Sequence, residues 1–125
     1  MKVFTLSEAN ELIPQTRLRL LRLQKLHAYL QAQKENAQRA AASASKGGGG
    51  IAEGGNYVAR LLEFSEINHE LDEMGIHIKD YERGLIDFPA WREGRIVFLC
   101  WILDEGDEIV WWHDMDAGFG GRQPL

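Results

Sequence analysis

The sequence has little cysteine and no long apolar run. These two absences argue against a disulfide-bonded protein and against a membrane-spanning protein. Cys100 is the single cysteine of the 125 residues, which excludes an internal disulfide. The longest apolar segment, residues 96–103, is far shorter than the roughly 20 residues that a membrane-spanning helix needs. The first ten residues, MKVFTLSEAN, lack the basic and apolar parts of a signal peptide. We therefore expect a cytoplasmic protein that does not enter a membrane.

Basic charge is also scarce in most of the chain. The net charge is −5, yet residues 1–46 carry eight Lys and Arg against three Glu, whereas residues 47–125 carry six against sixteen acidic residues. Basic residues balanced by an acidic remainder of the same chain usually pair internally. A nucleic-acid partner is therefore not expected. At 125 residues with 45% hydrophobic content, we expect one domain over residues 1–125.

The first half of the chain has helical patterns. Thr5 and Glu8 have the spacing of a capping box, so a helix should begin near residue 6. Pro14 lacks an amide hydrogen, so we expect a kink or break there, before a long helix over about residues 15–42. These elements form a helical arm, residues 1–43. A glycine-rich flexible linker, residues 44–55, precedes a second helix over residues 56–75, which ends at a glycine cap.

From residue 76 the hydrophobic period changes to that of strands. Four short segments separated by turn residues predict an antiparallel β-meander, followed by a tail docked on the sheet. The predicted fold class is α+β, with a long antiparallel helical hairpin packed on this meander. If residues 93–94 form a two-residue turn and residues 104–107 a four-residue turn, Asp87, Cys100 and Trp111 lie side by side, with Phe98 and His113 on the same face.

More apolar surface is present than one chain of this size should expose. The long first helix carries leucines on two faces, and Leu18 and Leu21 lie on the second of them. The strand over residues 96–103 is apolar on both faces, so other parts of the protein must pack against each of its two faces. The hairpin supplies one, and the folded-back tail or a second subunit supplies the other. We therefore predict a homodimer.

The tail, WWHDMDAGFGGRQPL, gathers residues suited to a site. His113 exchanges protons near neutral pH, and with Asp87 it is the predicted catalytic pair. Arg122 offers a positive fork for a carboxylate or phosphate, and glycine amides are able to point at the same anion. The predicted ligand-binding residues are Arg122, Asp116, Gly118, Gly120, Gly121 and Trp112. Alternatively, Arg122 bridges Asp87 or Asp116 and only fastens the tail.

A divalent metal is a further possibility. His113, Asp116 and Asp87 offer nitrogen and oxygen ligands close together, although His and Asp also pair for purely structural reasons. Cys100 lies inside the apolar strand, where we expect an inert buried thiol. Glu66 and His69 have a spacing used by carboxylate-bridged metal proteins, but only one copy is present and it lies on a solvated acidic stripe. No cofactor is specified by these patterns.

Three segments carry a resemblance to a known family: FTLSEANELIP, GIHIKDYERGLIDFPAWREGRIVFLCW and WWHDMDAGFGGRQPL. Together they resemble an uncharacterised bacterial family, domain of unknown function 2203. The resemblance implies a bacterial cytoplasmic protein and marks the C-terminal half as the informative one, but it implies no activity.

Two functional hypotheses follow from the residues. In the first, the sheet and tail form a site that binds a small anionic ligand, or binds it and acts on it, with Arg122 holding the anion. In the second, the protein is a non-catalytic homo-oligomeric scaffold whose tail is structural. They differ in the effect of His113→Ala, which abolishes ligand binding in the first and lowers only stability in the second.

Overall fold

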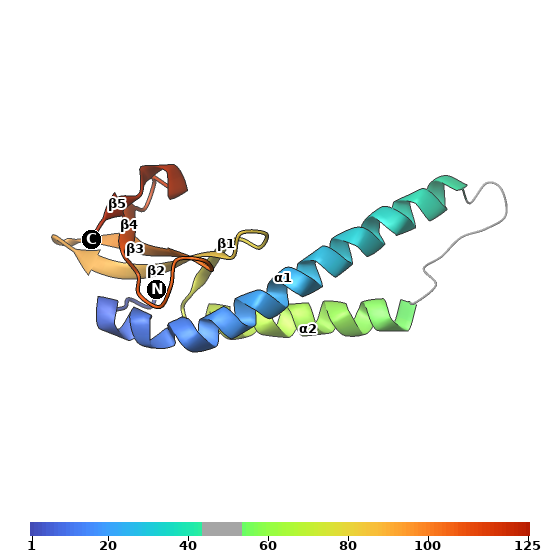
Figure 1. Cartoon of the computed structure of the whole chain (residues 1–125), viewed down its shortest axis with the longest axis horizontal. Coiled ribbons are helices and arrows are strands. Elements are labelled where there is room, and N and C mark those ends of the chain that lie inside the picture. Colours follow the sequence, from blue (N-terminus) through green and yellow to red (C-terminus); the bar gives the residue numbers. More distant parts are fainter. Residues whose placement is uncertain (44–53) are drawn as a thin grey trace.

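A computed structural model describes residues 1–43 and 54–125, and it has the predicted α+β architecture (Figure 1). Two helices, α1 (Leu6–Ser43) and α2 (Gly54–Glu73), form an antiparallel hairpin. Five strands follow: β1 (His77–Asp80), β2 (Leu85–Arg92), β3 (Arg95–Ile102), β4 (Trp111–Asp114) and β5 (Gln123–Pro124). The predicted linker lies almost wholly outside the described residues. No helix in residues 1–43 or 54–125 is long and apolar enough to cross a membrane.

The start of α1 is the predicted capping box. The Thr5 amide donates to Glu8 Oε1 at 2.8 Å, and the Glu8 amide donates to Thr5 Oγ1 at 3.0 Å. Of the two outcomes predicted at Pro14, a kink or a break, the break is wrong, because α1 is one helix of 38 residues. Pro14 lies on the exposed side, while Ile13 and Thr16 beside it are fully buried. Packing of these neighbours holds the helix through the position where one backbone hydrogen bond is lost.

Basic residues of α1 pair with acidic residues of α2, as the uneven charge of the sequence suggests. Arg22 donates two hydrogen bonds to the Glu63 carboxylate at 2.6 and 2.7 Å, and Arg19 donates to Glu70 at 2.8 Å. The predicted acidic stripe of α2 therefore meets the basic side of α1. These partly exposed pairs join the two helices along their contact.

The sheet is a meander in which every strand pairs with its neighbour in the chain, in the order β1-β2-β3-β4-β5. The β2–β3 turn consists of Glu93 and Gly94, both with positive φ, 51° and 78°. Such two-residue turns match the twist of a hairpin and fix its register. The predicted register is confirmed: Asp87 pairs with Cys100, and Cys100 pairs with Trp111.

The two faces of the sheet have different covers. Both helices lie on one side of it, and the C-terminal segment lies on the other (Figure 1). The main core lies between the helices and the sheet, and it includes Leu20 and Leu23 of α1 and Phe88, Leu99 and Trp101 of the sheet. The opposite face carries Asp87, Cys100 and His113, because these residues pair across the strands and alternate with the core residues.

The C-terminal tail is docked, as predicted. It forms a short 3₁₀ helix, η2 (Phe119–Gly121), and then the strand β5, which pairs Pro124 with Trp111 and Gln123 with Trp112. The Leu125 amide continues this pairing with a 2.9 Å hydrogen bond to the Val110 carbonyl. The strand β5 was not predicted, because a segment of two residues, one of them a proline, is too short to show the alternating hydrophobic pattern of a strand.

Candidate functional site

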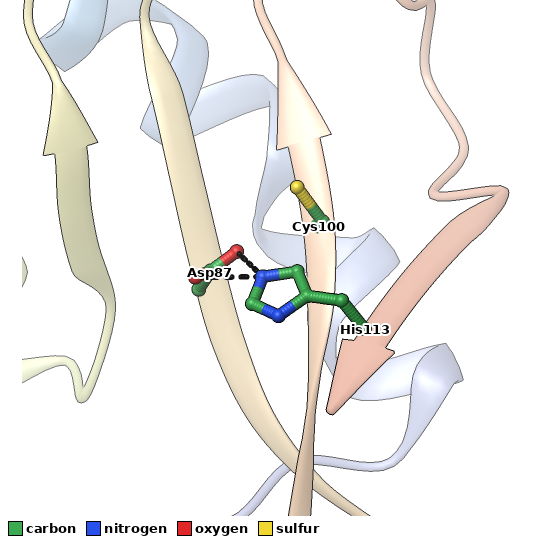
Figure 2. A group of neighbouring side chains, drawn as sticks. All are labelled: Asp87, Cys100 and His113. Carbon is green, nitrogen blue, oxygen red and sulfur yellow. Dashed lines mark hydrogen bonds and ion pairs between the residues drawn. The ribbon is translucent and has the colours of Figure 1, made fainter. Parts of the chain in front are cut away.

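A buried pair of ionisable residues lies at the centre of the sheet face opposite the helices. Asp87 comes from β2 and His113 from β4, on either side of β3 (Figure 2). His113 Nε2 lies 3.0 Å from both carboxylate oxygens of Asp87. The two side chains are only 2% and 3% exposed. Buried ionisable groups are rare outside paired or functional settings, so this pair is the natural centre of a site.

The second ring nitrogen of His113 decides how this pair is bonded. His113 Nδ1 lies 2.7 Å from the Asp114 carbonyl oxygen, which only accepts hydrogen bonds, so Nδ1 carries the hydrogen. In a neutral imidazole the Nε2 lone pair then points at the Asp87 carboxylate. Two acceptors facing one another need a positive charge between them. A proton shared by Nε2 and Asp87, or a bound cation, meets that need.

Cys100 completes the cluster from the central strand. One ligand atom each from Asp87, Cys100 and His113 lies within 4.8 Å of the others. The predicted burial of the thiol is confirmed, with Cys100 1% exposed. Burial, followed by the nearby Asp87 charge, raises the pKa of Cys100 to about 12. The thiol is therefore protonated at neutral pH and is a poor nucleophile.

A pocket of about 220 Å³ opens beside the cluster. Lys79 is the basic residue of its lining, and the rest of the wall is mainly apolar. The β1–β2 register shifts between Ile78 and Asp80, so Lys79 lies at an irregularity that turns its side chain over the Phe98 ring, 5.5 Å from the centroid. The lining residues are Lys79, Leu85, Asp87, Phe98, Cys100, His113, Met115, Gly118 and Phe119.

Residues 2–125 match a protein family described as an uncharacterized conserved protein (DUF2203). The chain belongs to this family. Comparison with curated proteins and with solved structures gave no match. The family assignment covers essentially the whole chain and confirms the resemblance seen in the sequence. It names no activity, so the function of this DUF2203 chain has to be argued from its own geometry.

Arg122 has a different partner from those predicted. The direct bridge to Asp87 or Asp116, expected in the alternative interpretation, is not among its hydrogen bonds and ion pairs. Its guanidinium instead donates to Glu105 at 2.6 Å and to the Cys100 carbonyl at 3.4 Å. Glu105 is held in place because its carboxylate also accepts a 2.9 Å hydrogen bond from the Ile102 amide. Arg122 thus fastens the tail to the end of β3, although through Glu105 and not through the predicted aspartates.

Trp112 and Asp116 lie away from the pocket. Strand alternation turns Trp112 to the helix side, where it is 5% exposed and part of the core, with the Arg92 guanidinium 4.6 Å from its ring centroid. Trp111 is the tryptophan on the site face, beneath Arg122. Asp116 is exposed in the turn after β4 and does not join the Asp87 cluster.

The glycines of the tail serve different purposes. Gly118 lines the pocket and has a positive φ of 65°, which favours glycine. The amide of Gly121 donates to the Gly118 carbonyl at 3.1 Å, closing the turn of η2, so it is not directed at a ligand. Gly120 lies within η2 and is not among the residues of the pocket wall.

Sequence reasoning found the pair at the centre of the site but missed part of its surroundings. Asp87 and His113 were both predicted, and the register that brings Cys100 beside them was also predicted. The thiol was set aside because its apolar strand suggested an inert residue. Lys79 and Met115 gave no signal, since one depends on an irregular register and the other on a turn conformation.

Proposed function

We propose that this protein binds a small carboxylate with a short apolar body in the pocket beside Asp87 and His113. The observation that carries the proposal is the buried Asp87–His113 pair in the wall of that pocket. We further propose that the proton held between His113 and Asp87 is exchanged when the ligand binds beside them. Arg122 is given no direct part, because it is not among the residues that line the pocket.

The charge of the pocket favours an anion. One proton shared between Nε2 and Asp87 leaves the pair neutral overall, so the Lys79 ammonium supplies the net charge. An anion entering beside Phe98 then meets Lys79 on one side and the shared proton on the other. Without that proton or another cation, the Asp87 carboxylate would repel the ligand.

The size and lining of the pocket favour a small molecule with an apolar part. Its 220 Å³ corresponds to about seven water molecules and is below the usual range for drug-sized ligands. Leu85, Phe98, Met115 and Phe119 supply the apolar wall. A short-chain or aromatic carboxylate fits this combination better than inorganic phosphate, which has no apolar surface.

Calorimetric titration with acetate, butyrate, benzoate and inorganic phosphate tests the proposal. Butyrate or benzoate should bind saturably and more tightly than phosphate. Lys79→Gln should weaken this binding roughly fivefold, the worth of one partly exposed ion pair, whereas Lys34→Gln on the exposed surface of α1 should not. Absence of saturable carboxylate binding, or equal affinity in Lys79→Gln, overturns the proposal.

Proton exchange by His113 needs a separate measurement. The same titration in two buffers of different ionisation enthalpy reports the protons taken up or released on binding. We expect a nonzero proton count in the wild-type protein that disappears in His113→Gln. The matched control is His69→Gln, which changes a histidine that is 71% exposed on α2. An unchanged proton count in His113→Gln would remove His113 from this role.

A homodimeric interaction protein is the second candidate function. It is supported by large apolar side chains that remain exposed on both helices: Leu18 71%, Leu62 59%, Val58 54% and Leu21 44%. We propose that a second copy covers part of this surface, and that the protein acts in the cytoplasm. Sedimentation should then show a dimer that Leu18→Glu converts to a monomer, while Gln31→Glu does not. A wild-type monomer at high concentration contradicts this.

A further inference from the structure

We propose that Asp87, Cys100 and His113 bind one transition-metal ion of the zinc class, with a fourth coordination position that faces the pocket. The use of that fourth position by a carboxylate rests on the proposed function. The metal site itself rests on the geometry of the three side chains (Figure 2).

The three donors have the separation and the burial that such an ion needs. Their ligand atoms lie within 4.8 Å of one another, and all three residues are buried. Bonds of about 2.0–2.3 Å in a tetrahedral zinc site place ligand atoms roughly 3.3–3.8 Å apart. A contraction of up to about 1.5 Å in the widest pair, with a slight widening of the 3.0 Å separation between His113 Nε2 and Asp87, therefore forms the site. Three adjacent strands supply the donors, so the sheet already fixes their relative positions.

His113 is oriented as a metal ligand. Its Nδ1 hydrogen is donated to the Asp114 carbonyl at 2.7 Å, which fixes the ring and directs the Nε2 lone pair at Asp87. Metal-binding histidines commonly use their other nitrogen in this way. Asp114 is itself held by a 2.8 Å hydrogen bond from Arg95, so the supporting layer extends to the surface. A cation between Nε2 and the carboxylate relieves the contact between two acceptors.

The donor set indicates which metal. Sulfur and imidazole nitrogen favour zinc, cobalt and similar ions, whereas magnesium and calcium prefer oxygen ligands alone. Three protein ligands and one open position are the arrangement of catalytic zinc sites; structural sites usually have four protein ligands. The open position faces the pocket, because all three donors line its wall. A metal there supplies the positive charge that a carboxylate requires beside Asp87.

Metal titration of the full-length protein tests this site without any other ligand. After treatment with a chelator, the protein is titrated with Co²⁺ alone and followed by absorbance. We expect one equivalent to bind and to displace the Cys100 thiol proton into the solvent, which gives the intense visible bands of four-coordinate cobalt and a thiolate-to-cobalt charge-transfer band. Because Cys100 is the single cysteine, that band alone identifies the sulfur ligand. Zn²⁺ should displace the cobalt.

Variants then assign the other ligands. Cys100→Ser should remove the charge-transfer band, and Asp87→Asn and His113→Gln should each weaken Co²⁺ binding at least tenfold. His69→Gln should leave the titration unchanged, because His69 is exposed and pairs with Glu73 at 3.1 Å. Circular dichroism of each metal-free variant shows whether it folds. Absence of saturable Co²⁺ binding in the wild-type protein, or binding without a charge-transfer band, overturns the metal site.

The two proposals fail separately. Carboxylate binding by the chelator-treated protein, with no uptake of Co²⁺, upholds the pocket and overturns the metal. A one-to-one cobalt complex whose spectrum no carboxylate changes, in a protein that binds no carboxylate, upholds the metal and overturns the proposed ligand. A spectrum that shifts saturably with butyrate or benzoate supports both, and it places the carboxylate on the metal.

Discussion

The Asp87–His113 pair predicts a strong and specific coupling in the stability of the protein. Asp87→Leu leaves the buried Nε2 atom of His113 without a partner, at a cost of about 1–3 kcal/mol in the free energy of unfolding. His113→Phe leaves a buried carboxylate unpaired, at a cost of about 3–5 kcal/mol. Independent sites would therefore lose about 4–8 kcal/mol together.

The double variant should lose far less than that sum. Replacing a buried ion pair by apolar side chains of similar volume is often close to neutral, because no charged group is left without a partner. We expect a coupling free energy of at least about 2 kcal/mol, which for a chain of this size is roughly 8 °C in Tm. Asp87→Asn should be milder than Asp87→Leu, because its amide is able to donate to Nε2.

Urea unfolding followed by tryptophan fluorescence measures the free energy of unfolding of the wild-type protein, the two single variants and the double variant, which together form a double-mutant cycle. A chelator in every sample keeps metal binding out of the comparison, since a bound ion would add its own stabilisation. The reasoning is refuted if the two single losses add to within about 0.5 kcal/mol, the spread expected of independent sites. Such a result would mean that the pair is not buried together in solution.

Three other predictions concern the ends and the hairpin. Thr5→Ala removes one half of the capping box and should cost about 1 kcal/mol in thermal unfolding. Deleting residues 123–125 removes β5 and should cost about 1–2 kcal/mol, with a matching drop in Tm. Hydrogen bonds from Arg22 lower the pKa of Glu63, so its contribution is present above the normal glutamate range and lost as the pH falls through the folded value. The urea midpoint of the wild-type protein should therefore exceed that of Glu63→Gln at neutral pH and converge with it at acidic pH; a difference that does not change with pH would contradict this.

The sheet was predictable in detail because local turn chemistry sets its register. Glu93 and Gly94 form a two-residue turn, so Arg92 pairs with Arg95. Each further pair of residues across β2 and β3 is then fixed by its distance along the chain from this turn. That count placed Asp87 beside Cys100 correctly. Strand alternation also required Trp111 and Trp112 to face opposite sides, but the sequence gives no local reason for choosing which of them faces the site.

The contacts that could not be predicted join side chains from separate loops. Arg122 meets Glu105 because the turn after β3 and the end of η2 lie side by side, and no period in the sequence records that proximity. The continuity of α1 through Pro14 is also a tertiary effect. Burial of Ile13 and Thr16 outweighs the local penalty of the proline, which is the only signal visible in the sequence.

The meander order of the sheet has a consequence for how the protein folds. Strands β1 to β4 join sequence neighbours, whereas the hydrogen bond from the Ile109 amide to Asn10 spans 99 residues. Loop-closure entropy makes such distant contacts slow to form, so the meander should assemble before α1 docks on it. Weakening the contact between Phe4 and Phe88, whose ring centroids lie 5.3 Å apart, should then accelerate unfolding and leave the folding rate nearly unchanged.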